Sequence, residues 1–300
     1  MSATIIDGRK IAEEIKREVA TGAKELQAAR DIIPGLAFIL VGDNPASQAY
    51  VRMKGKGCEE VGFYSVTEKL LANTSKKTLL DLIDLFNRDP KIHGILVQLP
   101  LPPQIREEEI MAAIDFRKDV DGFHPVNAGR LLLGQKCLKP CTPLGVQELL
   151  RRSGNDPGGK HVVIVGRSNI VGKPLANILV QKEQGANAIV TVAHSATEDL
   201  TSLTRQADIL VAAMGKPEFI TGEMIKLGAV VVDVGINRVS DSSSKNGTKI
   251  VGDVHFASAS TVARAITPVP GGVGPMTIAM LLRNTLWAAQ GGIYADHARG

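Results

Sequence analysis

The sequence predicts an α/β protein of two domains, the second with a doubly wound parallel sheet of the Rossmann type. From His161 onward, apolar runs of four to six residues alternate with segments of helical periodicity, a pattern typical of parallel strands joined by helices. Aromatic residues make up only 4% of the chain, so the core must consist of Ile, Val, Leu and Ala, as in sheets buried on both faces. A length of 300 residues is appropriate for about two domains.

Charge and cysteine content exclude several classes of protein. The net charge of +4 is spread along the chain without a polybasic block, so no nucleic-acid partner is expected. Three cysteines, an odd and sparse set, indicate a reducing compartment and predict neither disulfides nor a metal site. No stretch approaches about 18 consecutive apolar residues, and the first ten residues lack the apolar run of a signal peptide. We therefore expect a soluble, cytoplasmic protein that does not bind membranes.

The N-terminal domain is expected over residues 1–141, completed by a C-terminal helix over 275–300. Asp7 can cap the first helix, and Ser47 can cap a second helix that ends near Gly62. The expected elements are helices over 7–26, 47–62 and 76–87, buried strands over 36–41 and 93–99, a short acidic helix after Pro103 and a polar loop over 117–127.

The second domain is expected over residues 142–274. Thr142 and Pro143 can begin a helix that ends near Arg152, with Thr as the N-cap. The elements that follow are strands over 161–166, 188–194, 207–215 and 228–237, with helical segments between them, and a polar exposed loop over 240–249.

A glycine-rich turn follows the first strand of the second domain. The strand leads into Gly166, and the turn ends at Gly172-Lys173-Pro174, before a helix. In that position, backbone N–H groups and the helix dipole can hold a phosphate. The spacing G-x-S-x-x-x-G differs from the usual G-x-G-x-x-G, and such a turn can also connect strand and helix without a ligand. The strands that follow favour a nucleotide-binding site.

The second strand of this domain indicates which nucleotide binds. A site for NAD usually has Asp or Glu at the end of that strand, where it binds the ribose 2′-hydroxyl. Here the strand ends in His194-Ser195, and Arg167 in the glycine turn can pair with a 2′-phosphate through two N–H groups. NADP is therefore favoured over NAD, with a solvated surface side chain as the alternative for Arg167.

A tyrosine, a lysine, a glutamine and two aspartates form the candidate site of the N-terminal domain. Tyr50 and Lys54 are four residues apart and share one face of the predicted helix. From spacing alone, an amphipathic surface pair is the better explanation of these two. Gln98 lies at the carboxyl end of a buried strand, where α/β sheets usually bind ligands. Asp119 and Asp121 could bind a polar heterocycle, but aspartates in loops more often stabilise turns.

Seven segments spread over the chain carry a resemblance to a known family. They are YVRMKGKGCEEVG (50–62), HGILVQLPLP (93–102), KDVDGFHPVN (118–127), PCTPLG (140–145), VVIVGRSNIVGKP (162–174), VVDVGIN (231–237) and GDV…TPVPGGVGPMT (252–277). Through them, essentially the whole chain resembles the bifunctional methylenetetrahydrofolate dehydrogenase/methenyltetrahydrofolate cyclohydrolase family. Several of the segments are long and peculiar to that family, so the resemblance is specific.

The resemblance implies two reactions at one site, in a cleft between the domains. The family oxidises 5,10-methylenetetrahydrofolate with a nicotinamide nucleotide and hydrolyses the methenyl product to 10-formyltetrahydrofolate. In its motifs, the Tyr matched by Tyr50 stacks on the aromatic portion of the folate, and the Lys matched by Lys54 is the catalytic acid/base. The Gln matched by Gln98 supports that lysine, and the Asp matched by Asp121 binds the pterin ring.

The resemblance also implies further contacts and the assembly state. NADP is the expected cofactor, tetrahydrofolate derivatives are the expected substrates, and the chain is expected to form a homodimer. In the PVPGGVGP loop, residues Pro270, Gly271 and Gly272 are expected to contact substrate. The expected cofactor-binding residues are Gly166, Arg167, Ser168, Val171, Gly172, His194, Ser195 and Ile236.

Two other functions are compatible with parts of the pattern. A short-chain dehydrogenase also uses Tyr-x-x-x-Lys, but its nucleotide turn precedes that pair, whereas here Tyr50 and Lys54 precede the turn. A non-catalytic module that senses NADP would bind the nucleotide and leave methylenetetrahydrofolate unchanged. The presence of all four predicted catalytic residues argues against the second alternative.

Overall fold

The computed structural model describes residues 2–243 and 247–294, and it divides the chain into two compact units. Unit 1 comprises Met1–Ala12 and Thr142–Thr277, and unit 2 comprises Glu13–Cys141 and Ile278–Gly300. The prediction that residues 1–141 form one domain is therefore wrong for the first twelve residues. They belong to unit 1 because strand β1 (Thr4–Ile5) pairs in parallel with strand β11 (Ala265–Ile266).

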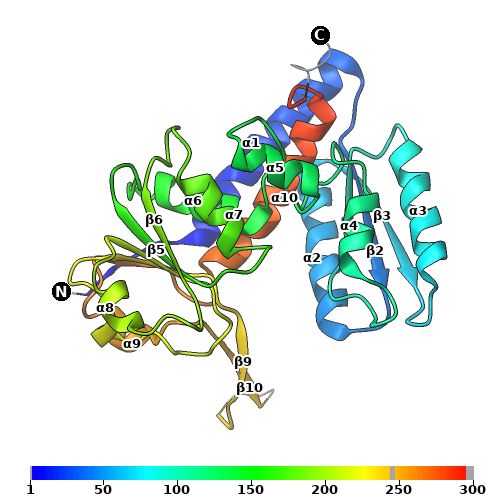
Figure 1. Cartoon of the computed structure of the whole chain (residues 1–300). Helices are drawn as coiled ribbons and strands as arrows, with labels where there is room; N and C mark the ends of the chain where they lie inside the picture. Colours follow the sequence, from blue (N-terminus) through cyan, green and yellow to red (C-terminus); the bar gives the residue numbers. More distant parts are fainter. Residues whose placement is uncertain (1, 244–246, 295–300) are drawn as a thin grey trace. The chain divides into compact units, whose positions relative to one another are not determined.

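Unit 1 is built on a six-stranded parallel sheet, shown in Figure 1. Its strand order is β1-β11-β8-β7-β5-β6. Strands β5, β7 and β8 are apolar runs buried on both faces, as expected for parallel strands covered by helices. Besides β1 and β11, the sheet contains β5 (His161–Val165), β6 (Ile189–Ala193), β7 (Ile209–Ala212) and β8 (Val230–Asp233).

Helices cover both faces of this sheet. The chain moves from β5 to β6 in one direction and then crosses back to β7, so right-handed connections place α7 and α8 on opposite faces. On the face of α8, alternate strand residues such as Val163, Leu210 and Val231 form one core cluster. The helices are α6 (Cys141–Arg152), α7 (Gly172–Leu179), α8 (Leu200–Thr204), the 3-10 turn η1 (Gly222–Met224) and α9 (Phe256–Ala259). The predicted doubly wound, Rossmann-like fold is confirmed.

Strands β9 (Asn237–Ser240) and β10 (Thr248–Val251) form an antiparallel hairpin that projects from unit 1 in Figure 1. The sequence predicted only a polar exposed loop over 240–249. That prediction is wrong at both ends of the loop, where the two strands pair. The strands were missed because their side chains are largely polar and at least partly exposed, which leaves a weak apolar signal. Residues 244–246 of the loop lie outside the described residues.

Unit 2 contains a three-stranded parallel sheet in the order β3-β2-β4. The central strand is buried along its whole length, and alternate residues such as Ala37 and Ile39 pack with α3 and α4. Helix α2 contacts β2 and β3 and lies on the other side of the sheet from α3 in Figure 1. The elements are β2 (Gly35–Val41), α2 (Pro45–Val61), β3 (Tyr64–Leu70), α3 (Lys76–Arg88), β4 (Gly94–Val97), α4 (Glu107–Ala113) and α5 (Pro125–Leu132).

Two long helices begin in unit 1 and continue in unit 2. Helix α1 spans Gly8–Arg30, and α10 spans Val273–Gln290. The predicted cap of α1 is confirmed, because the Asp7 carboxylate accepts from the backbone N–H of Lys10 at 3.0 Å. The last helix was expected over 275–300, but it begins two residues earlier and already ends at Gln290, so the predicted end is wrong; residues 295–300 lie outside the described residues.

Several predicted helix ends require correction. Helix α2 begins at Pro45, because the Asn44 side chain accepts from the backbone N–H of Ala46 and Ser47. Ser47 is therefore inside the helix and does not cap it. Helix α6 begins at Cys141, so Thr142 is likewise inside its helix. The predicted end of α2 is confirmed, since Gly62 adopts φ 77°, a left-handed conformation that suits glycine.

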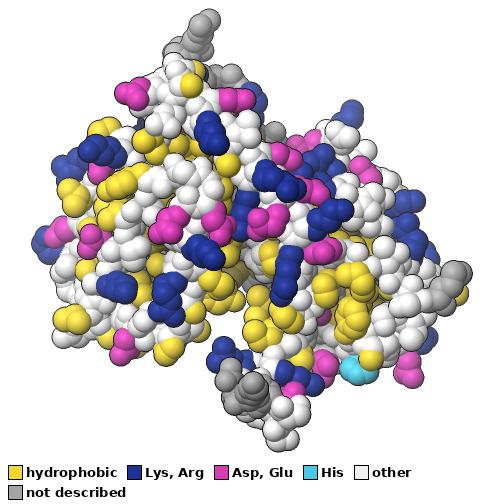
Figure 2. Space-filling model, turned by 180° about the vertical axis from the view of Figure 1, so that it is seen from behind, with side chains coloured by type: hydrophobic (Ala, Val, Ile, Leu, Met, Phe, Trp, Pro, Cys, Tyr) yellow, Lys and Arg dark blue, Asp and Glu magenta, His cyan; other side chains and the backbone are white. Residues whose placement is uncertain are grey.

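One face of the molecule is of mixed charge. On the face drawn in Figure 2, Lys and Arg side chains are interspersed with Asp and Glu. Among the helices that the structure describes, none has the length and apolar character needed to cross a membrane.

Candidate active site

Lys54 and Gln98 meet in unit 2. Lys54 lies on α2 and is only 7% exposed, and its Nζ donates to Oε1 of Gln98 at 3.1 Å. Gln98 follows β4 directly, and its backbone N–H extends the sheet by donating to the Ile39 carbonyl at 2.9 Å. Its Nε2 donates to the Leu99 carbonyl at 2.8 Å, which turns the amide oxygen toward Lys54. The structure therefore brings these two predicted residues together at the carboxyl end of β4.

Tyr50 lies one turn before Lys54 on α2. It is 39% exposed, so its ring is open to a ligand. Close to these residues, a Cβ at Gly57 would approach Ile278 Cγ2 to 3.2 Å, so glycine lets α2 lie close to α10. A Cβ at Gly55 would have no described atom within 4 Å, and packing does not explain that glycine.

Asp119 stabilises a turn. Its buried carboxylate accepts from the backbone N–H of Phe123 and His124, at 3.1 and 2.8 Å. It also accepts from Asn127 Nδ2 at 2.9 Å. These three bonds satisfy the carboxylate within the protein and lead the chain into α5. Asp119 is therefore the structural member of the predicted pair.

Asp121 has a different environment. Burial raises the pKa of its carboxyl, while the nearby Lys54 ammonium and the neighbouring Cys141 thiol act in the opposite direction. In the part of the chain that the structure describes, no backbone N–H group occupies its oxygens. Of the two aspartates, Asp121 is the one that keeps acceptor oxygens for a ligand beside Lys54.

Asn284 and Cys141, which the sequence reasoning did not select, hold the segment that carries Asp121. Asn284 on α10 is fully buried, and its Nδ2 donates to the carbonyls of Val120 at 2.8 Å and Lys139 at 2.9 Å. The Cys141 thiol donates to the same Val120 carbonyl at 3.2 Å. Burial and the neighbouring Asp121 raise the pKa of this thiol well above its usual value, so it stays protonated. A lone Asn among the apolar residues of the last helix was the available signal.

The predicted nucleotide-binding residues lie at the carboxyl edge of the sheet of unit 1. All six strands are parallel, so the segments that follow β5, β6, β7, β8 and β11 meet at one edge. The strand order reverses direction between β5 and β7, and such a switch point is where open α/β sheets bind ligands. The predicted nucleotide-binding residues lie after β5 (Gly166–Gly172), after β6 (His194 and Ser195) and after β8 (Ile236), and the residues predicted to contact substrate, Pro270–Gly272, follow β11 at the same edge.

The turn after β5 requires both of its glycines. Gly166 has φ 132°, and a Cβ there would overlap the carbonyl oxygen of Ala213. A Cβ at Gly172 would overlap the carbonyl oxygen of Gly166, so α7 starts directly against the end of β5. The Ser168 hydroxyl accepts from the backbone N–H of Val171 at 3.1 Å, which fixes the middle of the turn. This geometry leaves the N-terminus of α7 close to backbone N–H groups, a typical phosphate site.

Arg167 and the end of β6 present polar side chains at this edge of the sheet. Arg167 is exposed in the turn, and no group among the described residues pairs with its guanidinium. His194 Nδ1 accepts from the backbone N–H of Ala196 at 3.2 Å, and Ser195 beside it is exposed. Asp199, further along this loop, uses its carboxylate to cap α8 through the Ser202 N–H at 2.9 Å. That carboxylate is therefore engaged as a helix cap.

The loop after β11 is held to the start of α1. A Cβ at Gly8 would overlap the carbonyl oxygen of Gly272, and the Arg9 N–H donates to the Gly271 carbonyl at 3.1 Å. Gly271 has φ 117°, a conformation that few residues besides glycine adopt. Pro270 is exposed, as is Ile236 in the loop after β8.

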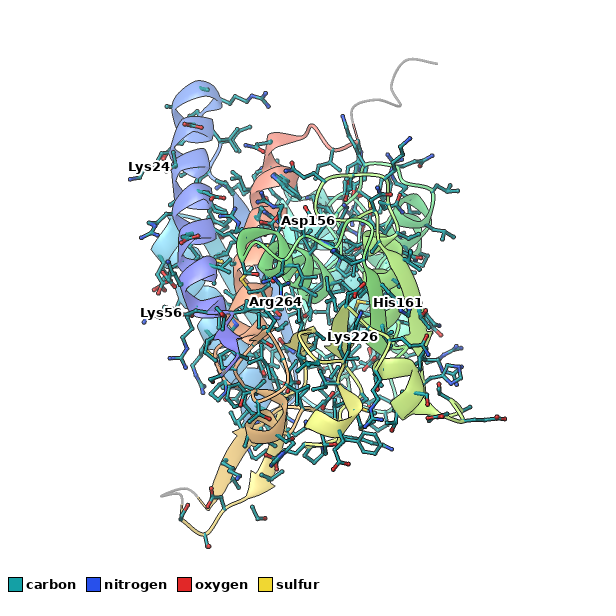
Figure 3. All side chains as sticks on the ribbon, turned by 90° about the vertical axis from the view of Figure 1, so that its left-hand side faces the viewer. Lys24, Lys56, Asp156, His161, Lys226 and Arg264 are labelled. Atoms are coloured by element: carbon teal, nitrogen blue, oxygen red, sulfur yellow. The ribbon has the colours of Figure 1, made fainter. Side chains whose placement is uncertain are left out.

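A charged cavity of about 180 Å³ lies at the opposite, amino edge of the same sheet, where Figure 3 labels Asp156, His161, Lys226 and Arg264. Lys226 Nζ lies 2.7 Å from Asp208 Oδ1, and the other oxygen of Asp208 accepts from the His161 N–H at 3.0 Å. These groups satisfy one another, and we assign the cavity no ligand.

The two halves of the chain match two models of one family. Residues 6–121 match the model described as tetrahydrofolate dehydrogenase/cyclohydrolase, catalytic domain. Residues 140–292 match the model described as tetrahydrofolate dehydrogenase/cyclohydrolase, NAD(P)-binding domain.

Individual relatives cover nearly the whole chain. The bifunctional protein FolD of Moorella thermoacetica is 59% identical over 290 residues, which are 97% of this chain and 100% of the relative. The crystal structure of the bifunctional enzyme FolD-methylenetetrahydrofolate dehydrogenase/cyclohydrolase from Campylobacter jejuni has a TM-score of 0.91 and 48% identity, covering 97% of this chain and 99% of that one. The Trypanosoma brucei dehydrogenase-cyclohydrolase, complexed with NADP cofactor and inhibitor, has a TM-score of 0.91 and 41% identity, covering 98% and 99%.

Proposed function

This chain belongs to the tetrahydrofolate dehydrogenase/cyclohydrolase family, and from that premise we propose which of its residues perform the two reactions. It is a bifunctional enzyme that oxidises 5,10-methylenetetrahydrofolate and hydrolyses 5,10-methenyltetrahydrofolate. We assign acid–base chemistry to Lys54, support of that lysine to Gln98, and folate recognition to Tyr50 and Asp121. The observation that carries the assignment is the 3.1 Å bond between Lys54 and Gln98 beside a desolvated carboxyl.

Hydrolysis of the methenyl group needs a residue that moves protons. Water adds to the electrophilic amidinium carbon and loses a proton, after which one carbon–nitrogen bond breaks and that nitrogen gains a proton. Lys54 in its neutral amine form can take the first proton, and the ammonium so formed can return the second. Gln98 Oε1 accepts one N–H of the lysine and so fixes its direction, because Gln98 Nε2 is itself bound to the Leu99 carbonyl.

Asp121 and Tyr50 are proposed to hold the folate. A carboxylate can accept two hydrogen bonds from the amino and ring N–H groups of a pterin, as it does from a guanidinium. The desolvation that raises the pKa of Asp121 in the free protein is offset when such donors bind the ionised carboxylate. The exposed ring of Tyr50, one turn from Lys54, offers a stacking surface for the aromatic portion of the substrate.

The oxidation needs a hydride acceptor, which a nicotinamide nucleotide supplies when bound. The turn between Gly166 and Gly172 fits the pyrophosphate, because its two glycines bring backbone N–H groups and the start of α7 to the switch point of the sheet. The proposed neighbours of the nucleotide are Arg167, Ser168, Val171, His194, Ser195 and Ile236.

We propose that NADP is preferred over NAD. Arg167 offers a planar, two-pronged donor for the 2′-phosphate, and the carboxylate of Asp199 is engaged as the cap of α8. The relative from Trypanosoma brucei, 41% identical, is described with bound NADP.

A homodimer is also proposed. Strand β6 ends the sheet of unit 1, and Ile189 and Val192 on it are 64% and 37% exposed. Such an edge offers unpaired backbone groups and apolar side chains to a second copy. Light scattering behind a sizing column tests this proposal, and a monomer mass at micromolar concentration would refute it.

We further propose a cytoplasmic location. The odd, sparse set of three cysteines is typical of a reducing compartment, and all three side chains are buried.

Lys54→Gln tests the assignment of the two reactions. The hydride leaves the methylene carbon directly, so oxidation needs no protein acid or base, whereas hydrolysis does. The variant keeps a polar side chain but cannot move a proton, and we expect cyclohydrolase activity to fall by about 10²–10⁴-fold. Dehydrogenase activity should fall far less, so that methenyltetrahydrofolate accumulates in the assay.

Lys56→Gln is the matched control, because Lys56 lies on the same helix with a side chain that is 76% exposed. It should leave both rates within about twofold of the wild type. Parallel losses of both activities in Lys54→Gln would show that the lysine only places the folate, and would refute the acid–base role.

A further inference from the structure

Two buried aspartates of unit 1 have no role in the function proposed above. Asp233 ends strand β8 in the segment VVDVGIN, and Asp253 lies in the segment GDV. Their side chains are almost inaccessible, at 3% and 0% exposed. No Lys or Arg among the described residues pairs with either carboxylate. Buried carboxylates without a cation are costly unless N–H groups satisfy them.

Asp233 fixes the backbone around Asp253. One of its oxygens accepts from the N–H of Asp253 and of Gly235, both at 2.9 Å. Its other oxygen accepts from the N–H of Val254, also at 2.9 Å. The backbone of residues 253–254 is thereby held against the end of β8.

Asp253 in turn joins two loops at the carboxyl edge of the sheet. Its Oδ2 accepts from the N–H of Met214 at 2.7 Å and of Gly215 at 2.9 Å, in the loop after β7. Its Oδ1 accepts from Nδ2 of Asn237 at 2.8 Å, and Asn237 is the first residue of β9, directly after the loop that follows β8. One carboxylate therefore fixes the relative position of both loops.

Two glycines make this arrangement possible. A Cβ at Gly252 would overlap the Asp233 carboxylate, and a Cβ at Gly235 would overlap the Asp253 carboxylate. The two aspartates and two glycines thus form one interlocked cluster that joins two separate segments of the chain.

We propose that Asp253 is a positioning residue for the nicotinamide nucleotide. The proposal rests on the function proposed above, in which the nucleotide lies along the carboxyl edge of unit 1. The loop after β7 begins beside the glycine turn, since Gly166 lies against the carbonyl of Ala213. The segment after β8 carries the exposed Ile236. Asp253 holds both loops through hydrogen bonds and is not proposed to contact the folate or the nicotinamide itself.

Asp253→Asn tests this role. The amide keeps one acceptor oxygen for the N–H groups of Met214 and Gly215 but carries no charge, so these two donors lose their charged acceptor. We expect the KM for NADP to rise about tenfold or more, the effect of losing hydrogen bonds to a charged group. Hydrolysis of methenyltetrahydrofolate, which uses residues of unit 2 and no nucleotide, should stay within about twofold. A merely structural defect would lower both activities.

A double substitution tests whether the NADP KM can be restored. In Asn237→Asp with Asp253→Asn, the amide at 253 can donate to the carboxylate at 237 and still accept from Met214 and Gly215. The charge also moves to a less buried position. We expect this variant to recover the NADP KM to within about threefold of the wild type. Asn237→Ala, which breaks only one loop contact, should give an intermediate KM even if the Asp253 variant fails to fold.

Asp208→Asn is the matched control, an aspartate in the same unit at the amino edge, beside the Lys226 labelled in Figure 3. It should leave the NADP KM unchanged. An unchanged NADP KM in folded Asp253→Asn, or equal losses in both activities, would overturn the positioning role. A wild type that oxidises methylenetetrahydrofolate with neither NADP nor NAD would instead refute the proposed function itself.

Discussion

The side-chain amide of Asn284 donates to the backbone carbonyl of Val120, the residue before Asp121, at 2.8 Å. The same amide group donates to the Lys139 carbonyl at 2.9 Å. A side chain of the last helix thereby fixes the backbone on which the proposed pterin-binding carboxylate depends. The precision of folate recognition is consequently shared between two segments that are far apart in the sequence.

Arg167→Ala should weaken NADP binding selectively. The exposed guanidinium is proposed to bind the 2′-phosphate, so its loss should cost about 1.5 kcal/mol, the low end for a charged hydrogen bond, or about tenfold in the KM for NADP. The weaker use of NAD should stay nearly unchanged. Steady-state dehydrogenase rates with both nucleotides measure this, with Lys160→Ala as an exposed cation control at the amino edge. Equal losses with NADP and NAD would mean that Arg167 shapes the turn.

Asp121→Asn should impair both folate reactions and leave the nucleotide site intact. The amide replaces an anionic acceptor of two hydrogen bonds with a single acceptor oxygen, so we expect kcat/KM to fall by about tenfold or more for each reaction. Calorimetric titration of the variant with NADP should give the wild-type affinity. A collapse of NADP affinity would show that Asp121 only supports the fold.

As the pH is lowered, the wild type should begin to lose folate affinity at a pH above the usual pKa of an aspartate. Burial raises the pKa of Asp121, and only the ionised carboxylate accepts both hydrogen bonds. The KM for folate should therefore rise as the pH falls through this raised pKa. Asp121→Asn cannot titrate, so its KM should lack that component. Identical pH profiles in the two proteins would contradict the assignment.

Asp233→Asn should change how stability depends on pH. Burial raises the pKa of Asp233 from 3.8 to about 6, despite three backbone N–H donors. The folded protein then binds more protons here than the unfolded chain, so this contribution to stability is complete below 3.8 and is lost as the pH rises through about 6. Relative to the variant, the wild type should lose about 1.4 kcal/mol between pH 5 and pH 8. Urea unfolding of both proteins across that range measures the difference, and parallel curves would contradict it.

The sequence predicts those elements that carry a strong apolar pattern of their own. Strand β5 is such a run, ending in a glycine turn, and both its position and its role in a doubly wound sheet are confirmed. Strand β3 was missed because only alternate residues are covered at the edge of its sheet. Helix α5 was missed because its start depends on the His124 side chain, whose Nδ1 accepts from the Val126 N–H.

The residues of the candidate site likewise differ in whether a local sequence pattern indicates them. Gln98 can be selected because it lies at the end of a buried strand, whereas the spacing of Lys54 alone favoured a surface side chain and only the family resemblance selected it. The structure joins their side chains. Asn284 and Asp253 could not be selected, because each acts through backbone groups of segments far away in the chain. Neither composition nor periodicity records such a contact, which exists only after the fold has formed.

Helices α1 and α10 each belong partly to unit 1 and partly to unit 2, so the folding of both units depends on the order in which the chain is made. Asn284 emerges from the ribosome long after Val120, and the intervening residues take on the order of 10–30 s to translate. Until then the Asp121 segment lacks its anchor, although most of unit 2 has been made. Strand β1, made first, must likewise wait for β11 before it can pair. Both halves of the enzyme thus mature only after residues 265–284 have been made, so a nascent chain would gain neither activity much ahead of the other.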